Sequence, residues 1–159
     1  MENEAKEIRK TDVLILMGSS SDMPTMEKAA AQLQEFGLSS EIIISSAHRN
    51  PDRTAQIARE AQDRGVKVII AGAGMAAALP GAVAAHTNLP VIGVPCASGA
   101  LNGFDSLLSI AQMPPGIPVA CVAINGAKNA AVLAAQIIAT GDVEVAAKVA
   151  EFRRKQSAA

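Results

Sequence analysis

Aromatic residues and excess charge are both scarce in this sequence. Its 159 residues include no tryptophan, no tyrosine and three phenylalanines, and the formal net charge is -1 with a pI of about 6.1. Nucleic-acid binding needs a basic surface, often interleaved with aromatic side chains for stacking, so we expect no nucleic-acid partner. The missing tryptophan and tyrosine also argue against a flavin stacked on aromatic rings.

Cysteine and histidine are equally rare, with two of each. Cys96 and Cys121 are too far apart for a CxxC motif and too few for a disulfide framework, and only two histidines are available to complete a metal site. We therefore expect two buried thiols in a reducing cytoplasm, no metal and no cofactor. The first ten residues alternate acidic and basic side chains, and the apolar run after them is too short for a signal peptide, so we expect no export.

Short β-branched runs alternate along the chain with longer segments of helical periodicity. The pattern predicts strands at 13–17, 41–45, 66–71, 90–94 and 118–124, and helices at about 24–36, 51–64, 79–85, 104–112, 127–138 and 143–155. Strands that read as continuous apolar runs are typical of a parallel sheet covered on both faces. We therefore predict a single α/β domain over residues 1–159, with its core at 12–140 and a C-terminal helix. Its architecture is a doubly wound, flavodoxin-like three-layer sandwich with strand order 2-1-3-4-5.

Charge is scarcest in the middle of the chain, where residues 68–127 contain one formal charge, Asp105. Glycine or proline recurs every few residues in this stretch, so we expect no membrane span. We expect the third, fourth and fifth strands to form the centre of the sheet. The apolar surface that remains exceeds what a small monomer leaves exposed, which predicts a symmetric homo-oligomer.

Ligands of a doubly wound sheet bind beyond the carboxyl ends of its strands, here near strands one and three. The loop after the first strand runs from Gly18 to Asp22. Its glycine, its three hydroxyl groups and the helix start that follows suit a phosphate or a sugar hydroxyl. A capping turn, in which Ser21 or Asp22 accepts bonds from helix amides and nothing binds, fits the spacing equally well.

The loops after the second and third strands differ in chemistry. His48 stands beside Arg49, which combines a side chain suited to proton transfer with a fork of donors for phosphate or carboxylate. A surface or capping histidine is the alternative. Residues 72–81 carry almost no functional groups, so they offer backbone amides and a dry wall, or close helix packing alone. His86 is expected to be structural or exposed.

Six segments of the chain together resemble one enzyme family. They are MGSSSD at 17–22, SAHRNP at 46–51, GAG with LPG within 72–81, LPVIGVP at 89–95, DSLLSIAQMPPGIPV at 105–119 and NGAKNAAVLAAQIIA at 125–139. These blocks, in this order, resemble the N5-carboxyaminoimidazole ribonucleotide mutases of purine biosynthesis, whose relatives include aminoimidazole ribonucleotide carboxylases. The resemblance covers residues 12–140, and it implies an octamer that needs no metal or organic cofactor.

The resemblance also implies a reaction and a site. A carboxylate would move from the exocyclic nitrogen to ring carbon 4 of an aminoimidazole ribonucleotide, through carbon dioxide released and recaptured in a closed site. By motif position, His48 would be the general acid and base. The residues that would bind the ribonucleotide, the last three through their backbone, are Ser19, Asp22, Arg49, Ser46, Gly74, Met75 and Ala76.

Two departures from the family pattern keep a second reaction open. Ala78 stands where most mutases carry a histidine, and Met75 replaces a glycine. The alternative is a carboxylase that fixes carbon dioxide directly, although that branch usually carries lysine where Arg49 stands. Arg49 and Pro51 favour the mutase. From other classes, a flavodoxin-like nucleotide-binding module without chemistry and a purely structural assembly subunit are the alternatives.

Overall fold

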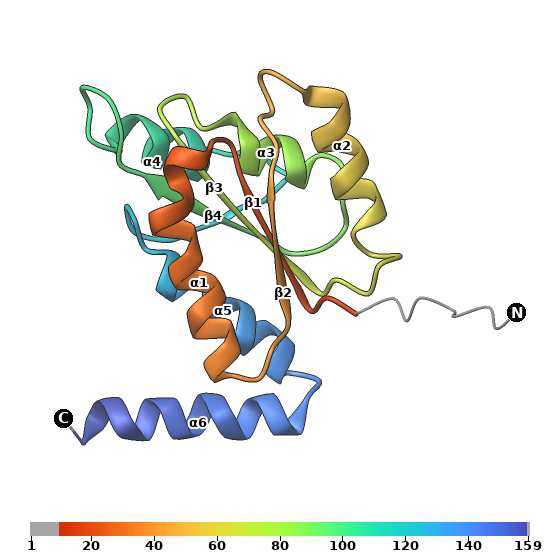
Figure 1. Cartoon of the computed structure of the whole chain (residues 1–159), viewed down its shortest axis with the longest axis vertical. Coiled ribbons are helices and arrows are strands. Elements are labelled where there is room, and N and C mark those ends of the chain that lie inside the picture. The colour runs from red at the N-terminus through yellow and green to blue at the C-terminus, as the bar shows by residue number, and fades with distance from the viewer. Residues whose placement is uncertain (1–9, 159) are drawn as a thin grey trace, which may run out of the picture.

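Five parallel strands form the centre of the protein (Figure 1) in the computed structural model, which describes residues 10–158. They are β1 (Val13–Met17), β2 (Ser40–Ile44), β3 (Val68–Gly74), β4 (Val91–Cys96) and β5 (Ala120–Cys121). Their order across the sheet is β2-β1-β3-β4-β5, and every neighbouring pair is parallel. The predicted fold class and strand order are confirmed. The prediction of no export rests on the first ten residues. Residues 1–9 lie outside the described part of the chain.

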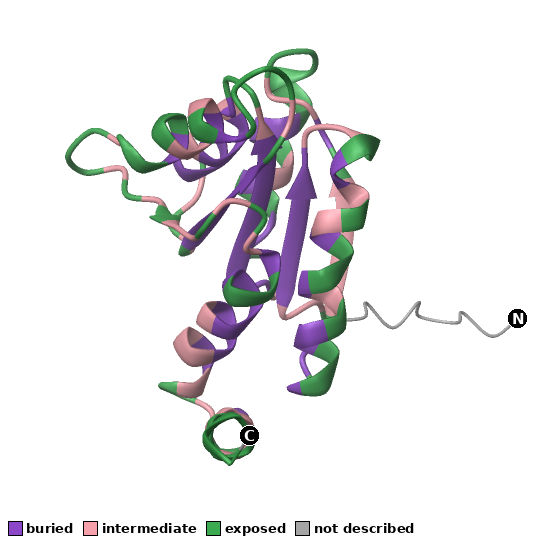
Figure 2. Cartoon of the chain, turned by 90° about the vertical axis from the view of Figure 1, so that its left-hand side faces the viewer, coloured by how far each residue is buried: buried purple, intermediate pink, exposed green. Residues whose placement is uncertain are grey.

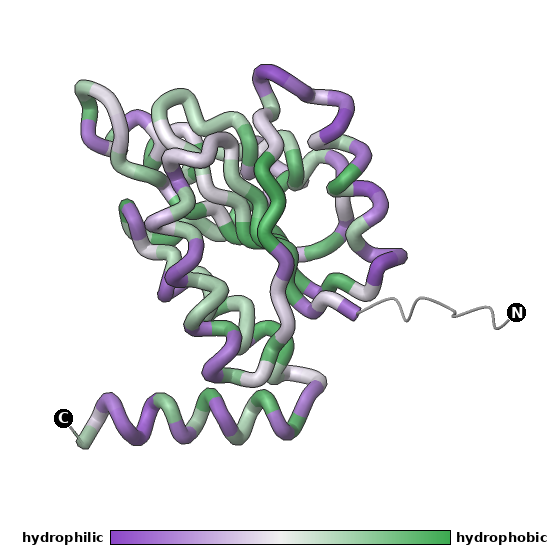
Figure 3. Tube along the Cα trace, viewed as in Figure 1, coloured by the Kyte–Doolittle hydropathy of each residue, from purple (hydrophilic) through white to green (hydrophobic). Residues whose placement is uncertain are grey.

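Helices cover both faces of the sheet and so complete three layers. One face packs against α1 (Met23–Glu35) and α5 (Ala127–Ala139), and the other against α2 (Pro51–Glu60), α3 (Ala78–Ala84) and α4 (Phe104–Ala111). In β1, Val13, Ile15 and Met17 belong to the first core, while Leu14 and Leu16 belong to the second. Because both faces are covered, the strands are apolar at successive positions rather than at alternate ones (Figure 3).

The last helix, α6 (Val143–Ser157), crosses the ends of α1 and α5 at the bottom of Figure 1 and is seen end-on in Figure 2. The Asp142 carboxylate caps it by accepting bonds from the amides of Glu144 and Val145, both at 3.1 Å. Phe152 packs edge-to-face on Phe36 with 5.4 Å between ring centroids. The helix therefore lies at the end of the molecule opposite the carboxyl ends of the strands.

The fifth strand is shorter than the sequence predicts, and its expected central place is wrong. Only Ala120 and Cys121 pair with β4, and they do so at the edge of the sheet, where Cys121 is half-buried rather than buried. Pro118 has no amide to donate to β4. Beyond Cys121 the chain no longer has strand geometry, but it still forms isolated backbone hydrogen bonds to β4. One of them runs from the Asn125 amide to the Pro95 carbonyl at 2.7 Å. Cys96 is buried, as predicted.

The other boundaries agree with prediction to within a few residues, with two exceptions. α2 ends at Glu60, and turns rather than helix continue to Gly65. β3 begins two residues later than expected and continues to Gly74, so the start of the predicted third loop belongs to the strand. No helix within residues 10–158 has the length and apolar character needed to cross a membrane.

Candidate active site

The loops that follow β1, β2, β3 and β4 meet at the carboxyl edge of the sheet around a cavity of about 420 Å³, which we call the sheet-edge cavity. It is lined by Gly18, Ser19, Ser21, Asp22, Ser46, Ala47, His48, Arg49, Ala73, Gly74, Met75, Ala76, Ala77, Ala78, Leu79 and Ser98. This set contains all eight residues that the sequence assigns to the site. The structure therefore brings them to one place, although they come from three separate loops.

The first loop presents one buried carboxylate to the cavity. Ser19 caps the short 3-10 turn that leads into α1, because its hydroxyl oxygen accepts a bond from the Ser21 amide at 3.3 Å. Asp22 makes no capping bond with its side chain, and the Ser21 hydroxyl donates to the Ser19 hydroxyl at 3.0 Å, so neither side chain caps the helix as the alternative expects. Burial raises the pKa of Asp22, although a hydrogen bond with the Ser19 backbone acts in the opposite direction. The Asp22 carboxylate can accept further bonds from a ligand beside this one.

Cys96, at the end of β4, is electrostatically coupled to this carboxylate. Burial, and secondarily the negative charge of Asp22, raise the pKa of the Cys96 thiol to about 12. Its thiol donates to the Val94 carbonyl at 3.7 Å. A thiol with such a pKa stays protonated at neutral pH, so Cys96 contributes packing here rather than a nucleophile.

The second loop places the histidine and arginine at the mouth of the cavity, where both side chains are exposed. The loop is anchored below by a 2.8 Å hydrogen bond between the buried hydroxyls of Ser45 and Thr54. Asn50 caps α2 by accepting from the Arg53 amide at 3.2 Å, as the Asn-Pro pair predicts. His48 and Arg49 are therefore carried on a fixed turn, with their side chains free to meet a ligand.

The third loop is strained and closely packed. Met75 and Ala77 both have left-handed backbone conformations, with φ of 54° and 41°, each costing about 1–2 kcal/mol for a residue with a side chain. The Ala77 amide bonds to the Gly74 carbonyl at 3.0 Å, and the Ser109 hydroxyl of α4 donates to the Ala76 carbonyl. These contacts hold the loop in a shape that its own backbone preferences oppose.

Gly74 is required by the closeness of its neighbours. A Cβ at this position would be 3.1 Å from the carbonyl oxygen of Cys96 and would overlap the Ser98 hydroxyl. The wall of the cavity is therefore backbone from β3 with Ser98 pressed against it. Such a wall can offer amide groups and apolar surface to a small planar ligand.

Comparison with known proteins identifies the family. The family model described as AIR carboxylase matches residues 12–159. The chain belongs to the AIR carboxylase family. The N5-carboxyaminoimidazole ribonucleotide mutases of Thermotoga maritima and Vibrio parahaemolyticus are 58% and 57% identical to it, over 89% and 90% of this chain and 82% and 90% of those proteins. The phosphoribosylaminoimidazole carboxylase of Candida glabrata is 51% identical over 96% of this chain, which spans 27% of that longer protein.

A solved structure agrees with this membership of the AIR carboxylase family. The crystal structure of Treponema denticola PurE superposes with a TM-score of 0.83 at 37% identity, covering 91% of this chain and 90% of that one.

Sequence reasoning missed two serines of this AIR carboxylase family member. Ser98 lines the cavity from the loop after β4, and Ser109 holds the third loop from α4. The rule that ligands bind at the carboxyl ends of strands also covers the fourth loop and could have found Ser98. No local pattern marks Ser109, since its partner, Ala76, is 33 residues away.

Proposed function

We propose that this protein is an N5-carboxyaminoimidazole ribonucleotide mutase, which moves a carboxylate from the exocyclic nitrogen to ring carbon 4 of the ribonucleotide during purine biosynthesis. The observation that carries the proposal is the meeting of His48, Asp22 and Arg49 with a nearly featureless backbone wall around one cavity. The close identity to mutases over most of the chain supports it. We also propose that it acts in the cytoplasm.

The binding roles follow from chemistry. Arg49 offers a fork of donors that suits the phosphate, assisted by the hydroxyl of Ser19. The Asp22 carboxylate accepts bonds from ribose hydroxyls. Ser46 and the backbone of Gly74, Met75 and Ala76 contact the imidazole and its carboxylate. The first loop thus contacts the phosphate and the ribose, the second the phosphate and the imidazole, and the third the imidazole with its carboxylate.

His48 carries the proton in this proposal. The bond between the exocyclic nitrogen and the carboxylate carbon breaks, carbon dioxide leaves, and the nitrogen keeps the electron pair and accepts a proton from His48. Carbon 4 then attacks carbon dioxide, and His48 takes the proton that carbon 4 releases. The His48 side chain thus returns to its initial protonation state. The apolar wall around residues 75–79 retains carbon dioxide and excludes water between the two steps.

The decisive experiment supplies the purified protein with N5-carboxyaminoimidazole ribonucleotide and no ATP. We expect the carbon-carboxylated isomer to form, and His48→Asn to lower turnover by roughly 10²–10⁴-fold. Because His48 is exposed, its replacement should leave the free energy of unfolding unchanged. Arg49→Gln should raise KM, while Arg53→Gln, which changes an exposed arginine outside the cavity, serves as its matched control.

Direct carboxylation is the second candidate, favoured by Ala78 at the position of the usual histidine and by the identity to the Candida glabrata carboxylase. If the protein converts only aminoimidazole ribonucleotide with carbon dioxide and leaves the N5-carboxylated compound untouched, the carboxylase is correct and the mutase is not. Turnover of either substrate would exclude a binding module without chemistry and a purely structural subunit.

We further propose a homo-oligomer, and an octamer on the resemblance. Four large apolar side chains support it because they are about 60% exposed: Met75, Leu101, Phe104 and Leu108. Phe104 and Leu108 share one face of α4, and a Cβ on Gly99 would touch Met75, which brings the patch to the rim of the cavity. Light scattering tests this, since a monomeric mass would refute it.

A further inference from the structure

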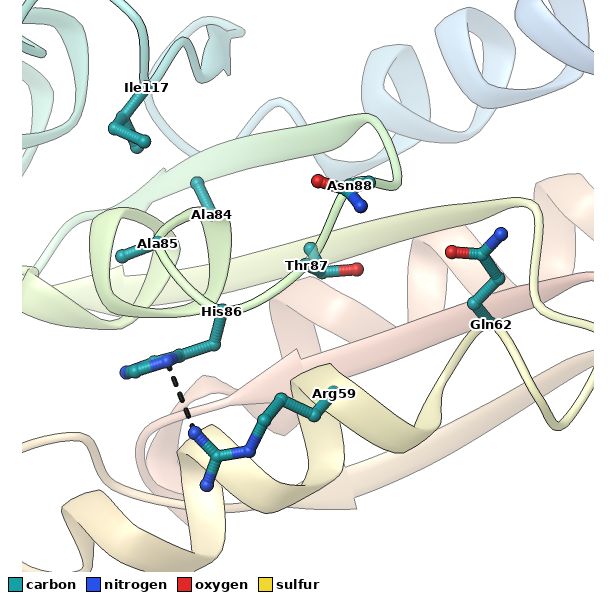
Figure 4. A pocket seen from close by; sticks show the side chains of 8 residues that line it. All are labelled: Arg59, Gln62, Ala84, Ala85, His86, Thr87, Asn88 and Ile117. Carbon is teal, nitrogen blue, oxygen red and sulfur yellow. Dashed lines mark hydrogen bonds between the residues drawn. The ribbon is translucent and has the colours of Figure 1, made fainter.

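A second cavity of about 390 Å³ lies on the side of the amino ends of the strands, away from the sheet-edge cavity (Figure 4). We call it the second cavity. It is lined by Arg59, Gln62, Ala84, Ala85, His86, Thr87, Asn88 and Ile117, none of which lines the sheet-edge cavity. α3 joins the two, because its first residues, from Ala78, border one cavity and its last, Ala84, borders the other.

Two basic side chains converge in the second cavity. Nη1 of Arg59 in α2 donates a hydrogen bond to Nδ1 of His86, which follows α3, at 3.3 Å (Figure 4). Arginine has no acceptor atom, so the histidine nitrogen accepts this bond. The last turn of a helix favours a cation, which accounts for Arg59 on α2. The hydrogen bond to His86 uses one N–H group of Arg59, and the other N–H groups of the guanidinium remain as donors. An anion beside this pair interacts favourably with the guanidinium charge.

No carboxylate lines the second cavity, and Arg59 takes no part in the ion pairs formed within residues 10–158. The other polar groups there are the amides of Gln62 and Asn88 and the hydroxyl of Thr87. The Thr87 oxygen accepts a bond from the Leu89 amide at 3.2 Å, so its hydrogen remains available for another acceptor. This supply of donors suits a group with several acceptor oxygens, as a phosphate has.

The volume and the remaining walls indicate more than an inorganic ion. Ala84, Ala85 and Ile117 make one side apolar, and the volume falls in the range of small-molecule sites, about 300–1,000 Å³. We propose that the second cavity binds an organic phosphate, with its phosphate beside the Arg59–His86 pair and its organic part against Ala85 and Ile117. This proposal does not depend on the function proposed for the sheet-edge cavity.

Calorimetric titration with adenosine 5′-monophosphate tests the proposal. Because the sheet-edge cavity is itself proposed to bind a ribonucleotide, all titrations use protein that carries Arg49→Gln. We expect this protein to bind the nucleotide, and the addition of Arg59→Ala to weaken binding by at least about tenfold through loss of a charged hydrogen bond. The addition of Arg53→Ala, which removes an exposed arginine from the same helix outside the cavity, should change nothing.

Inorganic phosphate and adenosine are titrated as separate arms. Both should bind more weakly than the nucleotide. If inorganic phosphate binds as tightly as the nucleotide, the proposed contact with the organic part is wrong. If adenosine binds as tightly as the nucleotide, the proposed phosphate contact is wrong. The proposed site is wrong if the Arg49→Gln protein does not bind the nucleotide, or if Arg59→Ala and Arg53→Ala lower the nucleotide affinity equally. None of these results bears on the turnover assay, so the two proposals fail separately.

Discussion

The substitution Gly74→Ala adds one methyl group to the wall of the sheet-edge cavity. The Ser98 hydroxyl can rotate away from the new Cβ. The Cys96 carbonyl oxygen, 3.1 Å from it, cannot, because Gly74 and Cys96 are opposite each other in the pairing of β3 with β4. Overpacking of this kind costs about 1–3 kcal/mol. Replacement of glycine by alanine also lowers the conformational entropy of the unfolded chain. Where the backbone conformation allows a side chain, this stabilises the folded state by about 0.4–1 kcal/mol.

Gly18→Ala separates these two contributions. Gly18 lines the same cavity, and a Cβ there would have no neighbour within 4 Å. This variant should be as stable as the wild type or more stable by up to about 1 kcal/mol. The difference in unfolding free energy between the two variants therefore measures the contact, which we expect to be about 1–3 kcal/mol.

Urea denaturation at one fixed protein concentration is the assay, with the midpoint and slope recorded for each variant. Addition of Ser98→Ala to Gly74→Ala should recover little of the lost stability, since the hydroxyl can rotate away and the contact with the Cys96 carbonyl remains. If Gly74→Ala is as stable as Gly18→Ala, the backbone at the end of β3 yields easily, and the close-packed wall described above is wrong.

Three further predictions concern neighbouring groups. Because burial raises the pKa of Asp22, its ionised form destabilises the folded state at neutral pH, and this destabilisation disappears as the pH falls through the raised pKa. Asp22→Asn should therefore have a higher free energy of unfolding than the wild type at pH 7, and the difference should narrow on acidification. The same variant should lose ribonucleotide binding. A margin that grows in acid would contradict this sign. Ser109→Ala leaves the Ala76 carbonyl without its partner and should slow turnover by roughly 2–10-fold, with recovery in Ser109→Thr as the check on a positioning role. Iodoacetamide at neutral pH should label half-buried Cys121 and spare Cys96 until urea is added, as read by mass spectrometry; early labelling of Cys96 would contradict its pKa of about 12.

Sequence reasoning succeeded wherever one local pattern decided the structure. The β-branched runs of β1 to β4 predicted strands, the Asn50-Pro51 pair predicted the start of α2, and right-handed crossovers favoured the strand order that is found. The same order located the ligand edge, which is how three loops could be chosen before their geometry was known. The roles given to their residues rest on the family resemblance.

The rest could not be predicted because it depends on contacts between distant segments. The apolar run before Ile124 reads as a strand, yet β4 supplies partners for two residues only. Asp22 looks like a capping residue, and only the packing of the fold buries its carboxylate. The second cavity gathers Arg59, His86 and Ile117 from three separate parts of the chain, each unremarkable on its own.

The short β5 bears on aggregation. A long, uncharged edge strand is a template on which other chains can add strands, and the charge-poor stretch that ends at Ala127 would supply one. Instead, Pro114, Pro115 and Pro118 precede a two-residue strand, and proline offers no amide to an incoming chain. The opposite edge, β2, carries Glu41 in an ion pair with Arg64. The β5 edge is thus protected without charge, whereas the β2 edge is protected by an ion pair.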